Sequence, residues 1–390
     1  MTFVSKRVSA DLRLDEQLEA GPGGRRSPGS NGDGVLGGYL RTSGSATHVL
    51  ITALLIAGGL WATFGGASIN LVGQYSAVYG IAVLGQVLLI GSAGQIALSG
   101  AAFMAIGAFV TGMLATSGIT AFPLPLLVSA VVGLVVGLIS GLPGLRFRGL
   151  YLLLASLALL YIVNSVAQSY EQDYHQGGLA IPPLHFAGMN LSAGRGLYFT
   201  LIVILVIVYL VVAAVERTGI GLAWHSIRES EVAASIAGVD TMRWKLYAFA
   251  FSGAITAVAG SLYGYVVGLA DSAAFDLTLS ISLITMVFIG GVRSRAGALL
   301  GAAIITALPT LLQDNLPGWL APLGLAKGWY ASNESNVNAG IFSLLFLLVI
   351  LFEPGGLEAL GRRIERSVRN RRARPRNRMA RSRTRETVGG

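Results

Sequence analysis

Few residues of this 390-residue chain have the type and spacing needed for covalent or metal chemistry. There is no Cys, so we expect neither disulfides nor thiolate metal ligands. No Gly-x-x-x-x-Gly-Lys-Ser/Thr phosphate loop is present. Four His occur, and none pairs at metal-ligand spacing: His48, His175, His185 and His225. We therefore expect no metal site, no cofactor and no catalytic residue in this chain. We look instead for residues that bind a ligand or a partner protein, or that transmit a conformational change.

The most informative polar segment is the loop 216–245, whose sequence is ERTGIGLAWHSIRESEVAASIAGVDTMRWK. Ser230 can cap a short helix that begins at Glu231, where the helix dipole favours an acid. Apolar residues follow at helical spacing, and Gly238 is suited to end the helix. The pattern predicts a short amphipathic helix. Such a helix can dock in a groove of a partner protein or lie on the lipid surface, and the residues alone favour neither.

Neutral polar side chains within apolar stretches form a second group of candidates. They offer hydrogen bonds without charge, which suits a zwitterionic or uncharged solute. The candidate pathway residues are Gln74, Gln95, Ser99, Asn164 and Gln168, with Gln86 as a further neutral amide. Each of them could equally hold neighbouring helices together by hydrogen bonds. The many Gly, Ala and Ser residues nearby favour close helix packing, and some could line a narrow pathway.

Long apolar runs must position these residues. Apolar residues make up 53% of the chain and charged residues 12%, about half of the roughly 25% usual in soluble domains. Because about twenty apolar residues span a bilayer as a helix, we predict an all-α polytopic membrane protein with about ten transmembrane helices. The predicted spans are 49–68, 69–90, 92–116, 121–142, 150–167, 197–215, 246–268, 277–291, 297–312 and 337–352. Within 92–116 and 277–312, Gly-rich sequence predicts broken or re-entrant helices.

Basic residues set the expected orientation. Twelve Arg follow Gly361, next to the last predicted span, where such a cluster marks the cytoplasmic side and attracts anionic lipid rather than nucleic acid. With both termini cytoplasmic, eight basic loop residues lie inside and two, Arg195 and Lys327, lie outside. The expected domains are a disordered cytoplasmic N-terminal extension (1–47), a transmembrane domain (48–355) and an Arg-rich cytoplasmic tail (356–390).

None of the predicted spans contains Asp, Glu, Lys, Arg or His. Proton relays and voltage sensors depend on such residues within the membrane, despite an insertion penalty of about 2.5–3.5 kcal/mol each. Their absence argues against a proton-coupled transporter, so uphill transport would need another source of energy. A passive channel or a membrane scaffold stays open on this observation alone.

Several stretches resemble the LivM-like permeases of branched-chain amino acid ABC transporters. The segment EVAASIAG at 231–238 is similar to the coupling motif of ABC importer permeases, with an acid, two small residues and a Gly. The stretches GSAGQIALSGAAF at 91–103, RGLYL at 148–152 and FEPGGL at 352–357 resemble blocks of that family and occur in the family order. The likeness covers about residues 70–360.

The resemblance implies a mechanism and partners. Two homologous permeases, this chain and a LivH-like one, would form the pathway in the plasma or inner membrane. Two cytoplasmic ATPases would bind the coupling loops and use the ATP, and an extracytoplasmic binding protein would deliver the solute. The implied coupling residues are Arg228, Glu229, Glu231, Ala233, Ala234 and Gly238.

Departures from the family pattern leave the solute open. Ser99 and Gly100 stand where family members often carry a His, and Arg293 stands where a Gly is common. Branched-chain amino acids or related small zwitterionic or neutral solutes are the expected cargo. The alternative function is a secondary transporter or channel for a small neutral solute, which would work without any ATPase.

Overall fold

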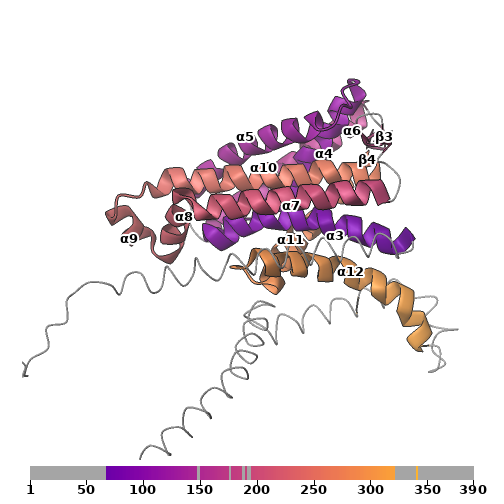
Figure 1. Ribbon diagram of the computed structural model, residues 1–390. Helices are drawn as coiled ribbons and strands as arrows, with labels where there is room; N and C mark the ends of the chain where they lie inside the picture. Colours follow the sequence, from indigo (N-terminus) through magenta and orange to yellow (C-terminus); the bar gives the residue numbers. More distant parts are fainter. Residues whose placement is uncertain are drawn as a thin grey trace, which may run out of the picture. The chain divides into compact units, whose positions relative to one another are not determined.

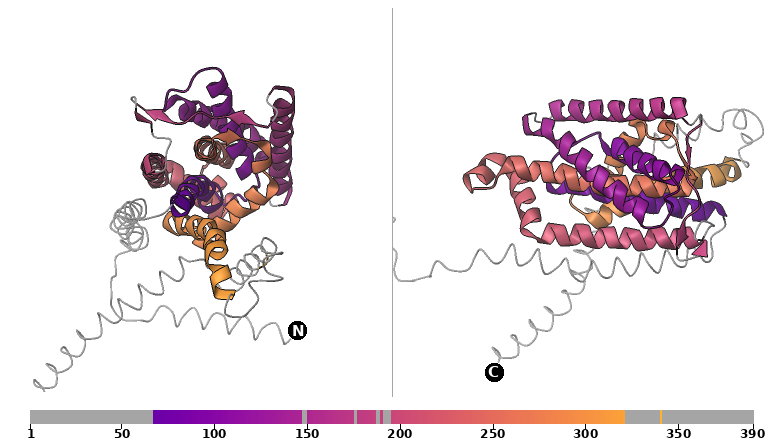
Figure 2. Two further views of the ribbon diagram at one scale, coloured as in Figure 1. Left: turned by 90° about the vertical axis from the view of Figure 1, so that its right-hand side faces the viewer. Right: turned by 90° about the horizontal axis from the view of Figure 1, so that it is seen from above.

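The chain is described here by a computed structural model that covers residues 67–146, 150–174, 177–186, 189–190, 195–320 and 340. These residues are mostly helical, and their strands are two residues long (Figures 1 and 2). The elements are α3 (Ala67–Gln86), the π-helix η1 (Val87–Ser92), α4 (Gly100–Thr116), α5 (Leu124–Arg146), α6 (Leu150–Tyr174), β1 (Leu179–Ala180), β2 (His185–Phe186), β3 (Met189–Asn190), α7 (Arg195–Arg217), α8 (Gly219–Glu229), α9 (Glu231–Ile236), α10 (Thr241–Val267), β4 (Leu269–Ala270), the 3-10 helix η2 (Ser272–Ala274), α11 (Leu277–Gly290) and α12 (Arg295–Leu320).

Six of the described helices are long and apolar enough to cross a membrane, and two shorter apolar helices, Gly100–Thr116 and Arg295–Pro309, accompany them. Each of these segments coincides with a span predicted from the sequence. The first and last predicted spans, 49–68 and 337–352, lie outside the described residues except at positions 67, 68 and 340. The terminal extension and the Arg-rich tail lie outside them too. The total of about ten spans and the cytoplasmic termini therefore stay predictions.

The helix α10 lies at the centre of the bundle and packs against α3, α4 and α5. The helices α3 and α10 are mostly buried, whereas α5, α6 and α7 expose most of their length, as lipid-facing helices do. A Cβ atom at Gly260 would collide with the carbonyl of Met104, and one at Gly107 would collide with the carbonyl of Ala257. The backbones of α4 and α10 therefore touch, which is the packing that small residues allow between membrane helices.

The bundle has two different ends (Figure 1). The helices α8 and α9 project at one end, here named the α9 end. At the opposite end, here named the strand end, β1 pairs antiparallel with β4, and β2 pairs antiparallel with β3. Glu171 near the end of α6 accepts hydrogen bonds there from the backbone N and the Oγ of Ser272, at 2.8 and 2.5 Å. This contact joins α6 to the segment that follows β4.

Charged residues in the long spans are confined to the span ends. The first or last five residues of these spans contain all of their charged side chains: Glu171, Asp173, Glu216, Arg217, Arg243, Lys245 and Asp276. The central parts of the six long spans carry none, as the sequence predicts. Charges at span ends can reach water or headgroups or, like Glu216 and Lys245, pair with an opposite charge, so they do not imply a proton relay within the membrane.

The predicted span 92–116 is not one continuous helix. The π-helix η1 continues α3, and after it the backbone N of Ala93 donates to the carbonyl of Leu88 at 3.1 Å. The chain is not helical from Ala93 to Ser99, where Gly94 takes a φ of +70°. It then enters α4, which begins at Gly100. The break that the Gly-rich sequence predicts is confirmed, and the non-helical residues 93–99 are here named the unwound segment.

Candidate functional site

The short helix α9 begins and ends where the sequence predicts. The Ser230 Oγ accepts a hydrogen bond from the backbone N of Ala233 at 3.3 Å, and Glu231 lies in the first turn. An acid at this place interacts favourably with the helix dipole. Gly238 takes a φ of +84°, a left-handed conformation that suits a helix end. The loop between α7 and α10 therefore contains a capped helix rather than an irregular turn.

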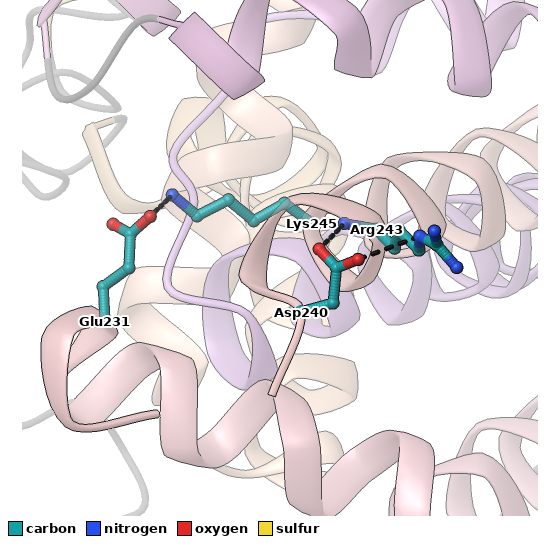
Figure 3. A network of polar contacts seen from close by, with 4 residues as sticks. All are labelled: Glu231, Asp240, Arg243 and Lys245. Atoms are coloured by element: carbon teal, nitrogen blue, oxygen red, sulfur yellow. Dashed lines mark hydrogen bonds and ion pairs between the residues drawn. The ribbon is translucent and has the colours of Figure 1, made fainter. Parts of the chain in front are cut away.

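Two ion pairs lie at the start of α10, and one of them joins this helix to α9 (Figure 3). The Lys245 Nζ lies 2.6 Å from the Glu231 Oε1, and both side chains are largely buried. Asp240 accepts from the backbone N of Arg243 at 3.2 Å and pairs with the Arg243 Nε at 2.8 Å, but this second pair is exposed. The first pair therefore fixes the position of α9, whereas the second mainly caps α10.

The outer surface of α9 presents apolar side chains to the surroundings. Ile236 is 82% exposed and Val232 is 64% exposed. Ala233 is exposed beside them, Ala234 is buried against the rest of the chain, and Glu229 is exposed at the end of α8. Exposed apolar residues on a projecting helix suit contact with a partner groove or with lipid.

The preceding helix, α8, is anchored to α10. The side chain of Trp224 is fully buried, and its Nε1 donates a hydrogen bond to the carbonyl of Trp244 at 2.7 Å. Its ring packs edge-on against Phe251, with centroids 6.1 Å apart. Because Trp244 and Phe251 belong to α10, the helices α8 and α10 are joined by both a hydrogen bond and an aromatic contact. A displacement of α8 would therefore act on the central helix of the bundle.

Arg228 connects α8 to the broken span. Its guanidinium donates a hydrogen bond to the carbonyl of Gly91, the fifth residue of η1. In an α-helix that carbonyl would bond the backbone N of Gln95, but this N donates to the carbonyl of Leu89 instead, at 3.0 Å. The irregular hydrogen bonding around η1 therefore leaves the Gly91 carbonyl for Arg228. Gly94 packs directly on the arginine stem, since a Cβ there would lie 2.8 Å from the Arg228 Cγ.

A second polar contact ties the same turn to α7 and α12. The Ser92 Oγ donates to the Glu216 Oε1 at 2.8 Å, and the Glu216 Oε2 pairs with the Arg295 Nε at 3.1 Å. The Arg295 guanidinium also lies over the ring of Tyr209, 5.5 Å from its centroid. Both charged partners are mostly buried. The end of η1 is thus held on two sides, by Arg228 from α8 and by Glu216 from α7.

Most of the unwound segment is buried, although Gly94 and Ile96 are exposed, and side-chain hydroxyls satisfy part of its backbone. The backbone N of Leu98 donates to the Ser156 Oγ at 2.8 Å, and the Leu98 carbonyl accepts from the Ser280 Oγ at 2.8 Å. The same Ser280 Oγ accepts from the backbone N of Ala101 at 3.1 Å. Non-helical backbone is tolerated at membrane depth only where protein or water provides such partners.

The predicted pathway residues fall into two groups. Gln95 and Ser99 lie in the unwound segment, are buried, and have no hydrogen-bonding partner for their side chains among the described residues; Gln86 at the end of α3 shares these properties. The other three candidates lie elsewhere: Gln74 is buried earlier on α3, Asn164 is half-buried on α6, and Gln168 is exposed on α6. The structure therefore gathers Gln86, Gln95 and Ser99 around the break in the span.

Sequence reasoning missed four residues that build this region. Glu216 and Arg295 lie at span ends, where the sequence suggests no more than ordinary flanking charges. Their opposite signs are nevertheless a signal that they could pair. Ser156 and Ser280 are hydroxyls within apolar spans, where hydrogen bonding back to the same helix is the usual expectation. Only the fold shows that Ser280 bonds the unwound segment instead.

A multi-pass helical bundle with uncharged span centres and a projecting capped helix at one end is the architecture of a polytopic membrane protein and suits a membrane permease. The sequence profile described as "Branched-chain amino acid transport system / permease component" matches residues 68–351. The chain belongs to this family and is the permease component of an ABC importer in the cell membrane.

Curated relatives agree with the family at moderate identity. The chain is 26% identical over 296 residues to the high-affinity branched-chain amino acid permease LivM of Salmonella typhimurium, covering 68% of each chain. It is 30% identical over 192 residues to a probable LivH permease of Methanocaldococcus jannaschii, covering 47% of this chain and 60% of the relative. It is 26% identical over 309 residues to the fructose import permease FrcC of Rhizobium meliloti, covering 72% of this chain and 82% of the relative. No solved structure matches the chain.

Proposed function

We propose that this chain and a second, homologous permease form the translocation pathway of an importer for branched-chain amino acids or related small zwitterionic or neutral solutes. Two separate ATPases bind at the α9 ends and use the ATP, and an extracytoplasmic binding protein delivers the solute. The relatives with LivM and LivH names support the pairing of two permeases. The fructose permease among them keeps small neutral solutes within the proposed class.

One observation supports the coupling role more than any other: the loop between α7 and α10 is exposed on its outer side, at α9, and contacts the broken span on its inner side, at α8. Val232 and Ile236 face outward. The other side of the same loop reaches η1 through the hydrogen bond from Arg228 to Gly91. A partner that pushes on α9 would therefore move the backbone next to the unwound segment, which is how binding energy can switch a pathway between two states.

The helix directions support the proposed topology. If ATPases bind at the α9 end, that end is cytoplasmic, and α3 runs from the outside inward because η1 lies near Arg228. The helix α12 begins with Arg295 at the same end and runs outward. One further span before α3 and one after α12, at the predicted positions 49–68 and 337–352, would then place both termini in the cytoplasm.

A double substitution tests the coupling role. Glu231→Lys together with Gly238→Val removes the ion pair with Lys245 and strains the left-handed turn that ends α9. In the complete transporter in liposomes, we expect ATP hydrolysis to continue while solute uptake is lost. The control is Arg243→Ala, which removes only an exposed pair next to α9. Normal ATP-driven uptake by the double variant would refute the coupling role.

The alternative, a secondary transporter or channel, predicts solute flux without ATP. Liposomes that contain this permease and its partner permease but no ATPase distinguish the two functions. The absence of charged side chains from the centres of the six described long spans argues against proton coupling. Flux at the full rate in these liposomes would favour the alternative.

Orientation has a simple test because the chain contains no Cys. Ser235 is exposed on α9, so Ser235→Cys introduces one reactive thiol on the proposed docking helix. We expect an impermeant maleimide to label it in inverted membrane vesicles and not in intact cells. Labelling from outside intact cells would place α9 on the wrong side of the membrane for an ATPase.

A further inference from the structure

The N-terminus of α4 lies near the middle of the bundle. The helices α4 and α10 run parallel here, because Gly260 packs on Met104 and Gly264 packs on Ala108. Together with the contacts of Gly107 with Ala257 and of Thr111 with Ser261, this register places the first residue of α4, Gly100, about level with residues 250–256, near the middle of α10. Transporter sites commonly lie at this depth, where a discontinuous helix begins.

Unpartnered polar atoms gather at this level. Both amide atoms of Gln86 are buried without a hydrogen-bonding partner among the described residues, and so are the hydroxyls of Ser99 and Thr256. Gln86 reaches from α3 to the start of α4, since its Nε2 lies 3.1 Å from the position of a Cβ at Gly100. The Thr256 Oγ1 lies 2.6 Å from the Cβ position of Gly85, next to Gln86 in the chain.

Buried polar groups without partners are unusual, because each costs about 1–3 kcal/mol of desolvation. Hydroxyls between α4, α5 and α10 are paired by contrast: the Thr111 Oγ1 donates to the Ser261 Oγ at 2.6 Å, and Ser129 donates to the Gly107 carbonyl at 3.2 Å. The unpartnered groups around Gly100 therefore point to a partner that is present for only part of a transport cycle.

The chemistry of these groups fits a zwitterion. A helix N-terminus attracts a carboxylate through its dipole, and the first turn of α4 contains no acid that would compete. The side chain of the N-cap residue, Ser99, makes no capping hydrogen bond, so its hydroxyl can serve the same carboxylate. The Gln86 amide offers a further donor in Nε2 and an acceptor in Oε1, which suits an ammonium group.

We propose that Gln86, Ser99 and the N-terminus of α4 bind the α-carboxylate and α-ammonium of an amino acid, between α3 and α4. This proposal rests on the proposed importer function and names the head group that the pathway recognises. The site is closed in this conformation, because the Gln86 amide fills the space in front of Gly100. The solute enters when α3 and α4 separate, and a movement of η1, which follows Gln86 directly, is suited to separate them.

Gln86→Leu tests the site in the permease pair with its ATPases in nanodiscs, with radiolabelled L-leucine as the probe. The soluble binding protein is left out because its own affinity would mask that of the membrane site. We expect the affinity for leucine to fall about tenfold or more. Thermal stability should stay equal or rise, because an unpartnered buried amide is replaced by an apolar group of similar shape.

The matched control is Asn70→Leu, which changes another amide on the same helix, whose Oδ1 is also buried without a partner among the described residues, but away from the break. Leucine affinity should be unchanged in this variant. If Gln86 were merely structural, Gln86→Leu would lower stability and leave affinity as it is, which would overturn the proposal. Equal losses of affinity in both variants would overturn it too.

Three competitors test the head group. We expect unlabelled leucine to displace the label, whereas leucinol, which lacks the carboxylate, and fructose displace it only at about tenfold higher concentration or more. Leucinol or fructose competing as well as leucine would overturn the zwitterion assignment, and so would absence of leucine binding to the unmodified complex. ATP dependence of uptake is measured separately in liposomes, so a failure of the importer function is distinguished from a failure of this site.

Discussion

The α9 end and the centre of the bundle treat polar groups in opposite ways. At the α9 end, charged groups are paired: Glu231 with Lys245 at 2.6 Å and Glu216 with Arg295 at 3.1 Å. At the centre, neutral groups such as Gln86 and Ser99 are buried without partners among the described residues. Paired charges connect neighbouring helices firmly, so that the displacement of one helix moves the next. Neutral groups without partners remain available to form hydrogen bonds with a bound solute. The difference separates where energy is applied from where the cargo is held.

The largest effect on stability is expected from Arg295→Met at the α9 end. The substitution leaves the mostly buried Glu216 carboxylate without its cation, and we expect a loss of about 3 kcal/mol in the free energy of unfolding. Thermal unfolding in detergent measures it. Adding Glu216→Gln removes the unpaired charge and should restore part of the loss. Equal stabilities of Arg295→Met and the unmodified chain would show that this pair is not a structural joint.

Ser280→Ala sharpens the comparison at the centre. Its Oγ bonds both the backbone N of Ala101 and the carbonyl of Leu98, so its removal leaves two buried backbone groups unsatisfied. We expect destabilisation of about 2 kcal/mol. Ser99→Ala, in the same region, removes a hydroxyl without a described partner and should leave stability almost unchanged. The same loss in both variants would contradict the distinction between paired and unpaired hydroxyls.

Arg228→Met tests transmission from one region to the other. It keeps the apolar stem against Gly94 but removes the guanidinium that bonds Gly91. We expect solute transported per ATP to fall about tenfold, as the loss of one charged hydrogen bond from the coupled state implies. The control is Arg217→Met, an exposed arginine at the end of α7. Unchanged coupling in Arg228→Met would mean that displacement travels by another route, such as Trp224.

The smallest effect is expected from Arg243→Ala. The side chains of Arg243 and Asp240 are 76% and 48% exposed, and exposed pairs contribute little. We expect a change below about 0.5 kcal/mol in the free energy of unfolding. A larger loss would show that exposed charges at the α9 end also hold the helix.

Local sequence signals predicted the α9 region well because its determinants are local. Ser230 caps the helix, Glu231 interacts with its dipole and Gly238 ends it. All three act within one helix, so their spacing in the sequence is enough to predict these roles. The break in the span at 92–116 was predicted for a similar reason, since Gly94 and its neighbours weaken a helix. Apolar runs predicted where the described spans lie because lipid imposes a length on each of them.

The partners of individual polar side chains could not be predicted because they depend on contacts between distant elements. Arg228 was singled out for its motif, but its contact with Gly91 joins residues 137 positions apart. Of the candidate pathway residues, Gln95 and Ser99 lie at the break, and Gln74 and Gln168 do not. Nothing in residue type separates these two groups. The decisive factor is which face of a helix meets the unwound segment, and packing sets that.

The π-helix η1 has a consequence for comparing permeases with one another. A π-turn contains one residue more than the α-turn it replaces, so it records an insertion in the chain. Removing one residue between Val87 and Ser92 would turn everything that follows by about 100° relative to α3. A different carbonyl would then face Arg228. Related sequences that use the same contact between an arginine of α8 and a carbonyl of η1 must therefore preserve the length of this stretch as well as the identity of its residues.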